Sequence, residues 1–270
     1  MRLIKLFLFL LPSVYSTQTV MAQAGKSSFL VCYGRLDPTS VKGYKLVILE
    51  AAHYKKDEIR LMRQNNDHVL AYISLGEVNE AAPHYKALKE STLGKNETWN
   101  SHYLDLSKPA THEVLMGLLQ KGFDNGFDGF FIDNLDNFGS FGPQKEQRHE
   151  FLDFLSKIRS KWPEKYFVQN AGIEMIDQTA GLMNGVIVES VATDYNFTHK
   201  MYRLRQPEKA FAQYADKLRQ LKEQHNIPVM LIEYAHSEKL KNQVQARLEP
   251  YRLDYFIANI DLQTLPKFKP

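Results

Sequence analysis

The segment of the chain that says most about its architecture reads GFDGFFIDNLD and spans residues 126–136. Its centre, residues 129–132, is a short and nearly continuous apolar run. Such a run does not alternate between apolar and polar residues, so it is typical of a strand covered on both faces, as in a parallel sheet. Asp133 follows directly, so the sequence predicts a carboxylate at the carboxyl end of this strand.

Seven further runs of the same kind occur along the chain. They are residues 29–33, 46–49, 69–73, 166–168, 186–188, 229–232 and 255–258. Between them lie helical patterns, in which apolar residues recur three or four positions apart. The clearest stripes are Val114, Leu115, Leu118 and Leu119, then Phe151, Leu155 and Ile158, then Phe211, Tyr214, Leu218 and Leu221 after Pro207.

Eight strands that alternate with helices in a chain of 270 residues predict an α/β fold, a single (β/α)8 TIM barrel rather than an open sheet. Residues 34–44 are barely long enough for a crossover helix, so we expect a short turn or loop after the first strand. No internal repeat, low-complexity tract or linker divides the chain. We therefore expect one domain over residues 25–270.

Acidic residues stand at or just after five of the predicted strands. They are Glu50, Glu77, Asp133, Glu189 and Glu233. In a barrel the carboxyl ends of all strands lie on one face, where the following loops build the active site. Like charges crowded together repel one another and cost stability, so such a cluster is usually kept for function. The sequence therefore predicts an active site with several carboxylates.

Two carboxylates facing each other across a sugar are the machinery of glycoside hydrolysis. One protonates the leaving oxygen, and the other attacks the anomeric carbon or activates water. The sequence has no His-x-His or His-Glu-x-x-His motif for zinc and no Gly-x-Ser-x-Gly elbow. The glycine-rich loops that bind phosphates or dinucleotides are also absent. These patterns favour a glycosidase over other hydrolases and over nucleotide-binding enzymes.

Four motifs occur in order along the chain. They are AYISLGE at residues 71–77, the segment 126–136, QNAG at 169–172 and VES at 188–190. With them the chain resembles the TIM-barrel domain of glycoside hydrolase family 114, the endo-α-1,4-polygalactosaminidase-like proteins, from the first to the sixth strand. The resemblance implies an endo-acting α-glycosidase on polymers of galactosamine and N-acetylgalactosamine, with no metal and no cofactor.

The strand ends and the resemblance agree on the catalytic pair. Asp133 is expected to be the nucleophile and Glu189 the general acid/base of a retaining hydrolase. The expected substrate-binding residues are Tyr33, Tyr72, Glu77, Asp136, Asn170 and Glu233. The acidic residues of this set would attract a partly de-N-acetylated polymer, because such a polymer is cationic.

Two alternatives remain open. Family members commonly carry an Arg after the Gly-Glu of strand three, but residues 80–85 supply none, which motivates a non-catalytic polysaccharide-binding protein on the same barrel. A hydrolase with a divalent ion at Asp133 and Asp136 is less favoured, because no histidine stands beside these acids. Trp99, in the segment after strand three, would either stack on a sugar ring or anchor its loop.

Charge and the N-terminal pattern bear on partners and location. The formal net charge is +3 without any basic block, so neither nucleic acid nor an anionic membrane is an expected partner. Residues 1–24 combine Arg2 and Lys5, an apolar stretch and the small residues of AQA at 22–24, the pattern of a cleaved secretory signal. We expect a secreted or periplasmic protein. The lone Cys32, inside an apolar run, is expected to be buried and inert.

Overall fold

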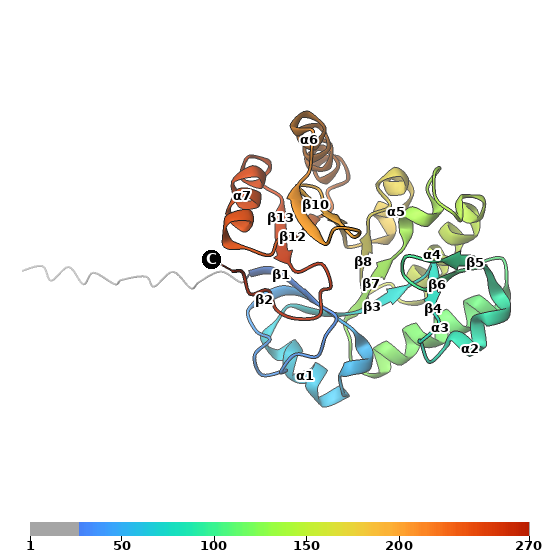
Figure 1. The fold of residues 1–270 in the computed structure, drawn as a ribbon. Coiled ribbons are helices and arrows are strands. Elements are labelled where there is room, and N and C mark those ends of the chain that lie inside the picture. The colour runs from blue at the N-terminus through green and yellow to red at the C-terminus, as the bar shows by residue number, and fades with distance from the viewer. Residues whose placement is uncertain (1–26, 270) are drawn as a thin grey trace, which may run out of the picture.

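The computed structural model describes residues 27–269. Eight parallel strands form one sheet in the order β1-β2-β3-β7-β8-β9-β12-β13, which curls into a nearly closed barrel with helices between the strands (Figure 1). The strands are β1 (Ser27–Cys32), β2 (Tyr44–Leu49), β3 (His68–Ser74), β7 (Gly129–Asp133), β8 (Tyr166–Asn170), β9 (Gly185–Glu189), β12 (Val229–Tyr234) and β13 (Asp254–Ala258). Each overlaps one of the eight apolar runs, and the TIM-barrel prediction is confirmed.

The helices pack around the barrel. The longer ones are α1 (Lys56–Asn65), α3 (Pro109–Asp124), α4 (Arg148–Lys161), α6 (Glu208–His225) and α7 (Glu238–Leu248), and α2 (Tyr85–Leu88) and α5 (Ile176–Thr179) are single turns. Short 3-10 helices span Ala51–His53, Lys89–Ser91, Leu135–Phe138, Lys145–Gln147, Ile173–Met175, Ala180–Leu182 and Glu249–Tyr251. The three predicted apolar stripes lie in α3, α4 and α6. Residues 33–43, all described, contain turns and no helix, as expected.

Side chains along each barrel strand alternate between two apolar layers, because successive residues of a strand point to opposite faces. In β2, Leu46 and Ile48 pack inside the barrel, whereas Val47 and Leu49 pack toward the surrounding helices. The inner layer includes Phe29, Val31, Leu46, Ile48, Leu70, Phe131, Val168, Ile187, Ile232 and Tyr234. This alternation determines which residue at each strand end points into the mouth of the barrel.

The seam of the barrel lies between β1 and β13, the two end strands of the sheet. The rings of Phe29 and Phe256 lie across it with centroids 6.0 Å apart. Beyond the strands, the Tyr33 backbone N–H donates to the Leu262 carbonyl at 2.7 Å. A side chain at Gly34 would lie 1.8 Å from the Gln263 carbonyl oxygen, so only glycine permits this approach. Side-chain packing and the segment after β13 thus close the seam.

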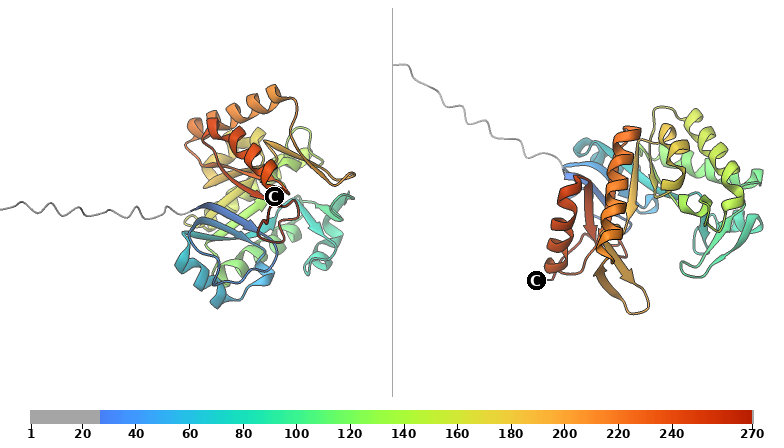
Figure 2. Two further views of the ribbon diagram at one scale, coloured as in Figure 1. Left: turned by 60° about the vertical axis from the view of Figure 1, so that its left-hand side comes forward. Right: turned by 90° about the horizontal axis from the view of Figure 1, so that it is seen from above.

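Two antiparallel insertions follow barrel strands. A three-stranded sheet of β4 (Glu77–Asn79), β5 (Thr92–Asn96) and β6 (Ser101–Leu104), ordered β4-β6-β5, follows β3. A hairpin of β10 (Thr193–Asn196) and β11 (Met201–Leu204) follows β9. Both project from the barrel on the same side in Figure 2. These short strands were not predicted from the sequence.

Within the described residues, no helix has the length and apolar character needed to cross a membrane. The secretory signal expected at residues 1–24 lies outside the described residues.

Candidate active site

Three neighbouring barrel strands end in polar side chains that point toward the mouth. They are Asp133 on β7, Asn170 on β8 and Glu189 on β9. The residues two positions earlier on these strands, Phe131, Val168 and Ile187, belong to the inner layer. Because residues two apart on a strand share a face, the fold directs all three polar side chains inward.

The amide of Asn170 joins the two candidate catalytic carboxylates. Its Nδ2 donates one hydrogen bond to Oδ1 of Asp133 and another to Oε1 of Glu189, each at 2.8 Å. An amide nitrogen has two hydrogens to donate, so both contacts form at once. Since both oxygens lie 2.8 Å from the same nitrogen, they are at most twice that distance, 5.6 Å, apart.

Two tyrosines complete the contacts of this pair. The Tyr72 hydroxyl donates to Oδ2 of Asp133 at 2.7 Å, and the Tyr234 hydroxyl donates to Oε2 of Glu189. Asp133 Oδ1 also accepts from the backbone N–H of Asn134 at 2.8 Å. Both carboxylates are therefore fixed by donors from neighbouring strands and the turn after β7.

The surroundings of the carboxylate pair raise the pKa of Glu189 and of the two tyrosines that contact the pair. Burial raises the pKa of Glu189 above its ordinary value of 4.5, and the charge of Asp133 adds to the effect, while the donors Tyr234 and Asn170 oppose it. Burial and nearby carboxylates also hold the pKa values of Tyr72 and Tyr234 well above the usual 10, so both stay hydrogen-bond donors. A half-buried carboxyl with a raised pKa is suited to carry a proton to a substrate.

The backbone is strained directly after each of the three polar residues. Asn134, Ala171 and Ser190 have φ angles of 69°, 54° and 56°, in the left-handed region. This conformation costs a non-glycine residue roughly 1–2 kcal/mol, less for Asn. Strain of this kind clusters at functional sites, where the surrounding structure holds it in place. Its recurrence at three adjacent strand ends supports the choice of this face as the candidate active site.

Tyr33 and Glu50 stand on the opposite part of the mouth. The Tyr33 ring packs on Tyr72 with centroids 4.8 Å apart, so it supports the residue that binds Asp133. Burial raises the pKa of Tyr33, followed by the charges of Glu189, Asp133 and Glu50. Glu50 itself accepts from the backbone N–H of Ala52 and has no hydrogen bond to the catalytic pair.

Glu77 lies in β4, outside the barrel, and is buried. Its carboxylate accepts hydrogen bonds from four side chains, Asn96, Ser101, Asn134 and Asn137. It therefore ties the β4–β6–β5 sheet to the loop after Asp133.

Asp136 is exposed in that same loop, where its Oδ1 accepts from the backbone N–H of Gly172 at 2.8 Å. No group of three or more His, Cys, Asp or Glu side chains in residues 27–269 is arranged to hold a metal ion.

The position of Glu233 corrects a sequence expectation. This residue is 0% exposed, and it accepts from the backbone N–H groups of Val191, Ala192 and Thr193 and from the Thr193 hydroxyl. It lies between the inward-facing Ile232 and Tyr234, so it points away from the barrel axis. Its carboxylate holds the start of the β9–β10 connection, and a substrate-binding role does not fit this position.

Tyr234, which was not predicted as a site residue, occupies the place expected for Glu233. The alternation of side chains along β12 shows that Ile232 and Tyr234 point to one face and Glu233 to the other. Which face is inside was not readable, since both faces of the strand are apolar.

The chain is similar to known glycoside hydrolases in sequence and in structure. A model of glycoside-hydrolase family GH114 matches residues 13–264. The solved glycoside hydrolase domain of PelA from Pseudomonas aeruginosa is 25% identical, with a TM-score of 0.77, over 89% of this chain and 98% of that chain. No match was found among curated protein sequences.

Two more distant structures share the fold. Aspergillus fumigatus Ega3, solved in complex with galactosamine, is 18% identical over 90% of this chain and 93% of its own, with a TM-score of 0.65. The α-galactosidase TtGalA from Thermus thermophilus is 11% identical over 90% of this chain and 59% of its own, with a TM-score of 0.53.

Proposed function

The chain belongs to glycoside-hydrolase family GH114 and is a glycosidase, and we propose that it cleaves α-1,4 linkages within galactosamine-containing polysaccharides with retention of configuration. The observation that carries the proposal is the bridge that one amide, Asn170 Nδ2, makes between Asp133 and Glu189. The galactosamine bound to the similarly folded Ega3 supports the choice of an amino sugar.

The spacing of the carboxylates supports retention. Retaining glycosidases hold their two carboxyl groups about 5–5.5 Å apart, whereas inverting ones leave about 6.5–9.5 Å for a water molecule. The bridged oxygens of Asp133 and Glu189 are at most 5.6 Å apart, which supports a retaining rather than an inverting reaction.

Each residue then has a defined part in the reaction. Glu189 gives its proton to the glycosidic oxygen as the bond to the leaving sugar breaks, and Asp133 attacks the anomeric carbon to form a glycosyl ester. Glu189 then removes a proton from water, which attacks the same carbon and releases Asp133. Asn170, Tyr72 and Tyr234 keep the two carboxylates at this spacing through their hydrogen bonds.

The decisive experiment counts new reducing ends on de-N-acetylated α-1,4-galactosamine polymer. We expect release by the parent protein and a loss of at least about a thousandfold in the Asp133→Asn and Glu189→Gln variants. NMR of the first product would give its anomeric configuration, and α-configured ends are expected. β-Configured first products would contradict retention.

The same assay separates the alternative function. Saturable binding of the polymer by the parent without new reducing ends would favour a non-catalytic polysaccharide-binding protein. Neither binding nor cleavage of galactosamine polymers would contradict the proposed substrate while leaving the family membership intact.

Export is a separate part of the proposal, supported by the sequence pattern of residues 1–24. After expression of the full chain in a bacterial host, we expect the protein in the periplasm or medium with Gly25 as its first residue. Retention in the cytoplasm with an intact N-terminus would contradict it. Terminal sequencing by mass spectrometry provides the measurement.

A further inference from the structure

The tips of the two insertions touch each other through aromatic rings. Trp99 lies in the turn between β5 and β6, and Phe197 lies in the turn between β10 and β11. Their ring centroids are 5.6 Å apart in an edge-to-face arrangement, a favourable geometry for aromatic pairs. Both rings remain more than half exposed, Trp99 at 58% and Phe197 at 53%.

The contact spans part of the barrel mouth. The β4–β6–β5 sheet follows the third strand of the barrel, β3, and the β10–β11 hairpin follows the sixth, β9. Between them in the sheet stand β7 and β8, which carry Asp133 and Asn170. Figure 2 shows both insertions extending beyond the barrel and converging. The Trp99–Phe197 contact therefore forms an arch on the face that carries the catalytic pair.

Both ends of the arch are anchored beside that pair. Glu77, at the start of β4, accepts a hydrogen bond from Asn134, the residue after Asp133. Thr193, which begins β10 four residues after Glu189, donates to the buried carboxylate of Glu233. The arch is thus positioned by the same turns that position the catalytic residues.

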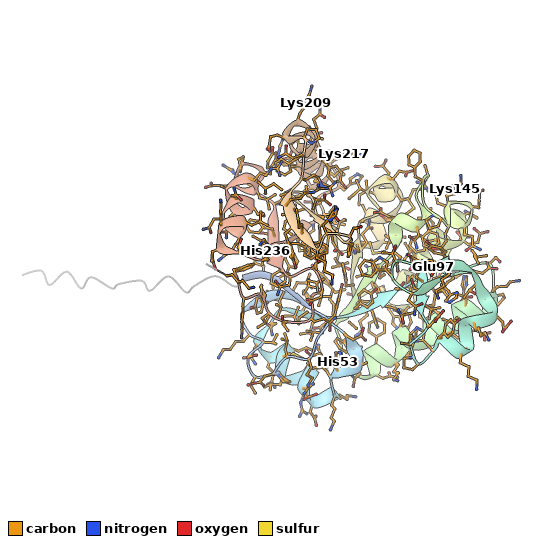
Figure 3. All side chains as sticks on the ribbon, in the orientation of Figure 1. His53, Glu97, Lys145, Lys209, Lys217 and His236 are labelled. Atoms are coloured by element: carbon orange, nitrogen blue, oxygen red, sulfur yellow. The ribbon has the colours of Figure 1, made fainter. Side chains whose placement is uncertain are left out.

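An aromatic row continues from the arch across the mouth. It consists of Trp99, Phe197, Tyr195, Tyr202 and His236, with successive ring centroids 5.6, 5.0, 4.7 and 5.1 Å apart. His236 follows β12, so the row reaches from the insertion after β3 to the loop after β12. Figure 3 labels His236, the last ring of the row, and Glu97, which lies in the same β5–β6 turn as Trp99.

Exposed apolar side chains gather on these two insertions. Among the described residues, six large apolar side chains are exposed, and four of them, Leu93, Trp99, Phe197 and Met201, belong to the β5–β6 and β10–β11 segments. Contiguous exposed apolar surface on a folded protein usually marks a binding site. The Trp99 and Phe197 rings are exposed and lie outside the core, so core packing does not account for them.

We propose that the aromatic row binds amino-sugar units of the polymer that lie several units away from the bond being cleaved. Sugar rings present C–H faces that pack on aromatic rings, and a protonated amino group is attracted to the face of Trp or Tyr. Except for His236, the row lies on two insertions that are anchored next to the strand ends of the catalytic pair, so a polymer bound at that pair would extend along it. The identity of the polymer rests on the proposed function, and the row then gives the enzyme its preference for long chains.

Tryptophan fluorescence tests the binding directly. The chain has two tryptophans, Trp99 and Trp162, so the Trp162→Phe variant leaves Trp99 as the sole indole. The Asp133→Asn substitution is added to prevent cleavage. Titration with de-N-acetylated galactosamine polymer is then expected to change the Trp99 emission saturably. The matched Trp99→Phe protein, which keeps Trp162, is expected to show no change. Unchanged Trp99 emission at saturating polymer would overturn the proposal.

Kinetics test the preference for length. The ratio of kcat/KM for long polymer to that for the shortest cleaved oligomer is expected to fall about fivefold in Trp99→Ala, as for the loss of one exposed ring contact. Trp99→Phe should restore most of the ratio. Leu93→Ala, an equally exposed apolar change on the same insertion, should leave the ratio as in the parent. An unchanged ratio in Trp99→Ala would contradict the row's role.

The outcomes separate this proposal from the proposed function. Cleavage by the parent with no effect of Trp99 in either assay leaves the glycosidase assignment standing and removes the aromatic row. A polymer-dependent change in Trp99 emission without any cleavage by the parent supports the row and contradicts the proposed reaction.

Discussion

At the scale of single residues, Asn170 determines the geometry of the site. It touches both carboxylates, and its amide fixes the distance between them. Asp133 and Glu189 have no hydrogen bond to each other, and two carboxylates that both carry a charge repel. The amide thus offsets the repulsion and holds the spacing on which the proposed retaining reaction depends.

Removing this amide tests its importance. Asn170→Ala is expected to lower kcat on the order of a hundredfold, because both carboxylates lose a donor and their spacing relaxes. Circular dichroism should remain that of the parent, and polymer binding should persist. A loss of kcat smaller than about fivefold would show that Asn170 does not position the pair.

The raised pKa of Glu189 predicts the pH dependence of cleavage. The first step needs Glu189 protonated, so kcat/KM should fall on the alkaline side as this group loses its proton. Because its pKa lies above the ordinary 4.5, this fall should begin at a higher pH than an unperturbed glutamate would give. A pH profile of kcat/KM provides the measurement.

Removing the Tyr234 hydroxyl should move the alkaline limb of the kcat/KM profile in a definite direction. Its hydroxyl donates to the Glu189 carboxylate and thereby lowers the pKa of Glu189. Tyr234→Phe removes the donor, so the pKa rises and the alkaline limb of the profile should move to higher pH. Tyr251→Phe, outside the site, should leave the limb in place. A shift of the limb to lower pH in Tyr234→Phe would contradict the assignment of Glu189 as the acid.

At the scale of elements, β7 depends on a close approach to β8. Gly129 pairs with Tyr166, and a side chain at Gly129 would lie 1.6 Å from the Tyr166 carbonyl oxygen. Gly129→Ala is expected to destabilise the protein by about 1–3 kcal/mol, because the strands must separate. Gly117→Ala, in α3 with open space around it, should instead stabilise by up to about 1 kcal/mol. Urea unfolding of both variants tests the contrast, and equal effects would contradict it.

The two insertions after β3 and β9 were not predicted from the sequence. Their strands are three to five residues long and carry polar side chains such as Glu77, Asn79 and Asn196. Short strands with little apolar content give no periodicity to detect. Their pairing comes from the turns at their tips and from contacts to the barrel, which are tertiary.

At the scale of the whole molecule, the barrel is completed by the segment after β13. Leu262 is 4% exposed, and its carbonyl accepts the Tyr33 N–H at the seam. Leu262→Ala should destabilise by about 2–4 kcal/mol and lower activity, because Tyr33 supports Tyr72. Leu265→Ala, three residues on and 38% exposed, should change stability by no more than about 0.5 kcal/mol. Thermal unfolding and reducing-end assays test both, and equal stability losses would contradict the role of Leu262 in the seam.

The sequence by itself determined the eight strands, their parallel arrangement and the strand ends that carry Asp133, Asn170 and Glu189. Long apolar runs separated by amphipathic helices leave few other folds, and parallel strands in a barrel bring their carboxyl ends to one face. The tertiary structure decided which residue of each strand end points inward. A strand that is apolar on both faces does not reveal its inner face, so Glu233 was expected in the site where Tyr234 stands. Only the tertiary structure decided the Asn170 bridge and the Trp99–Phe197 contact. Both join residues far apart in the chain, at distances that only packing sets.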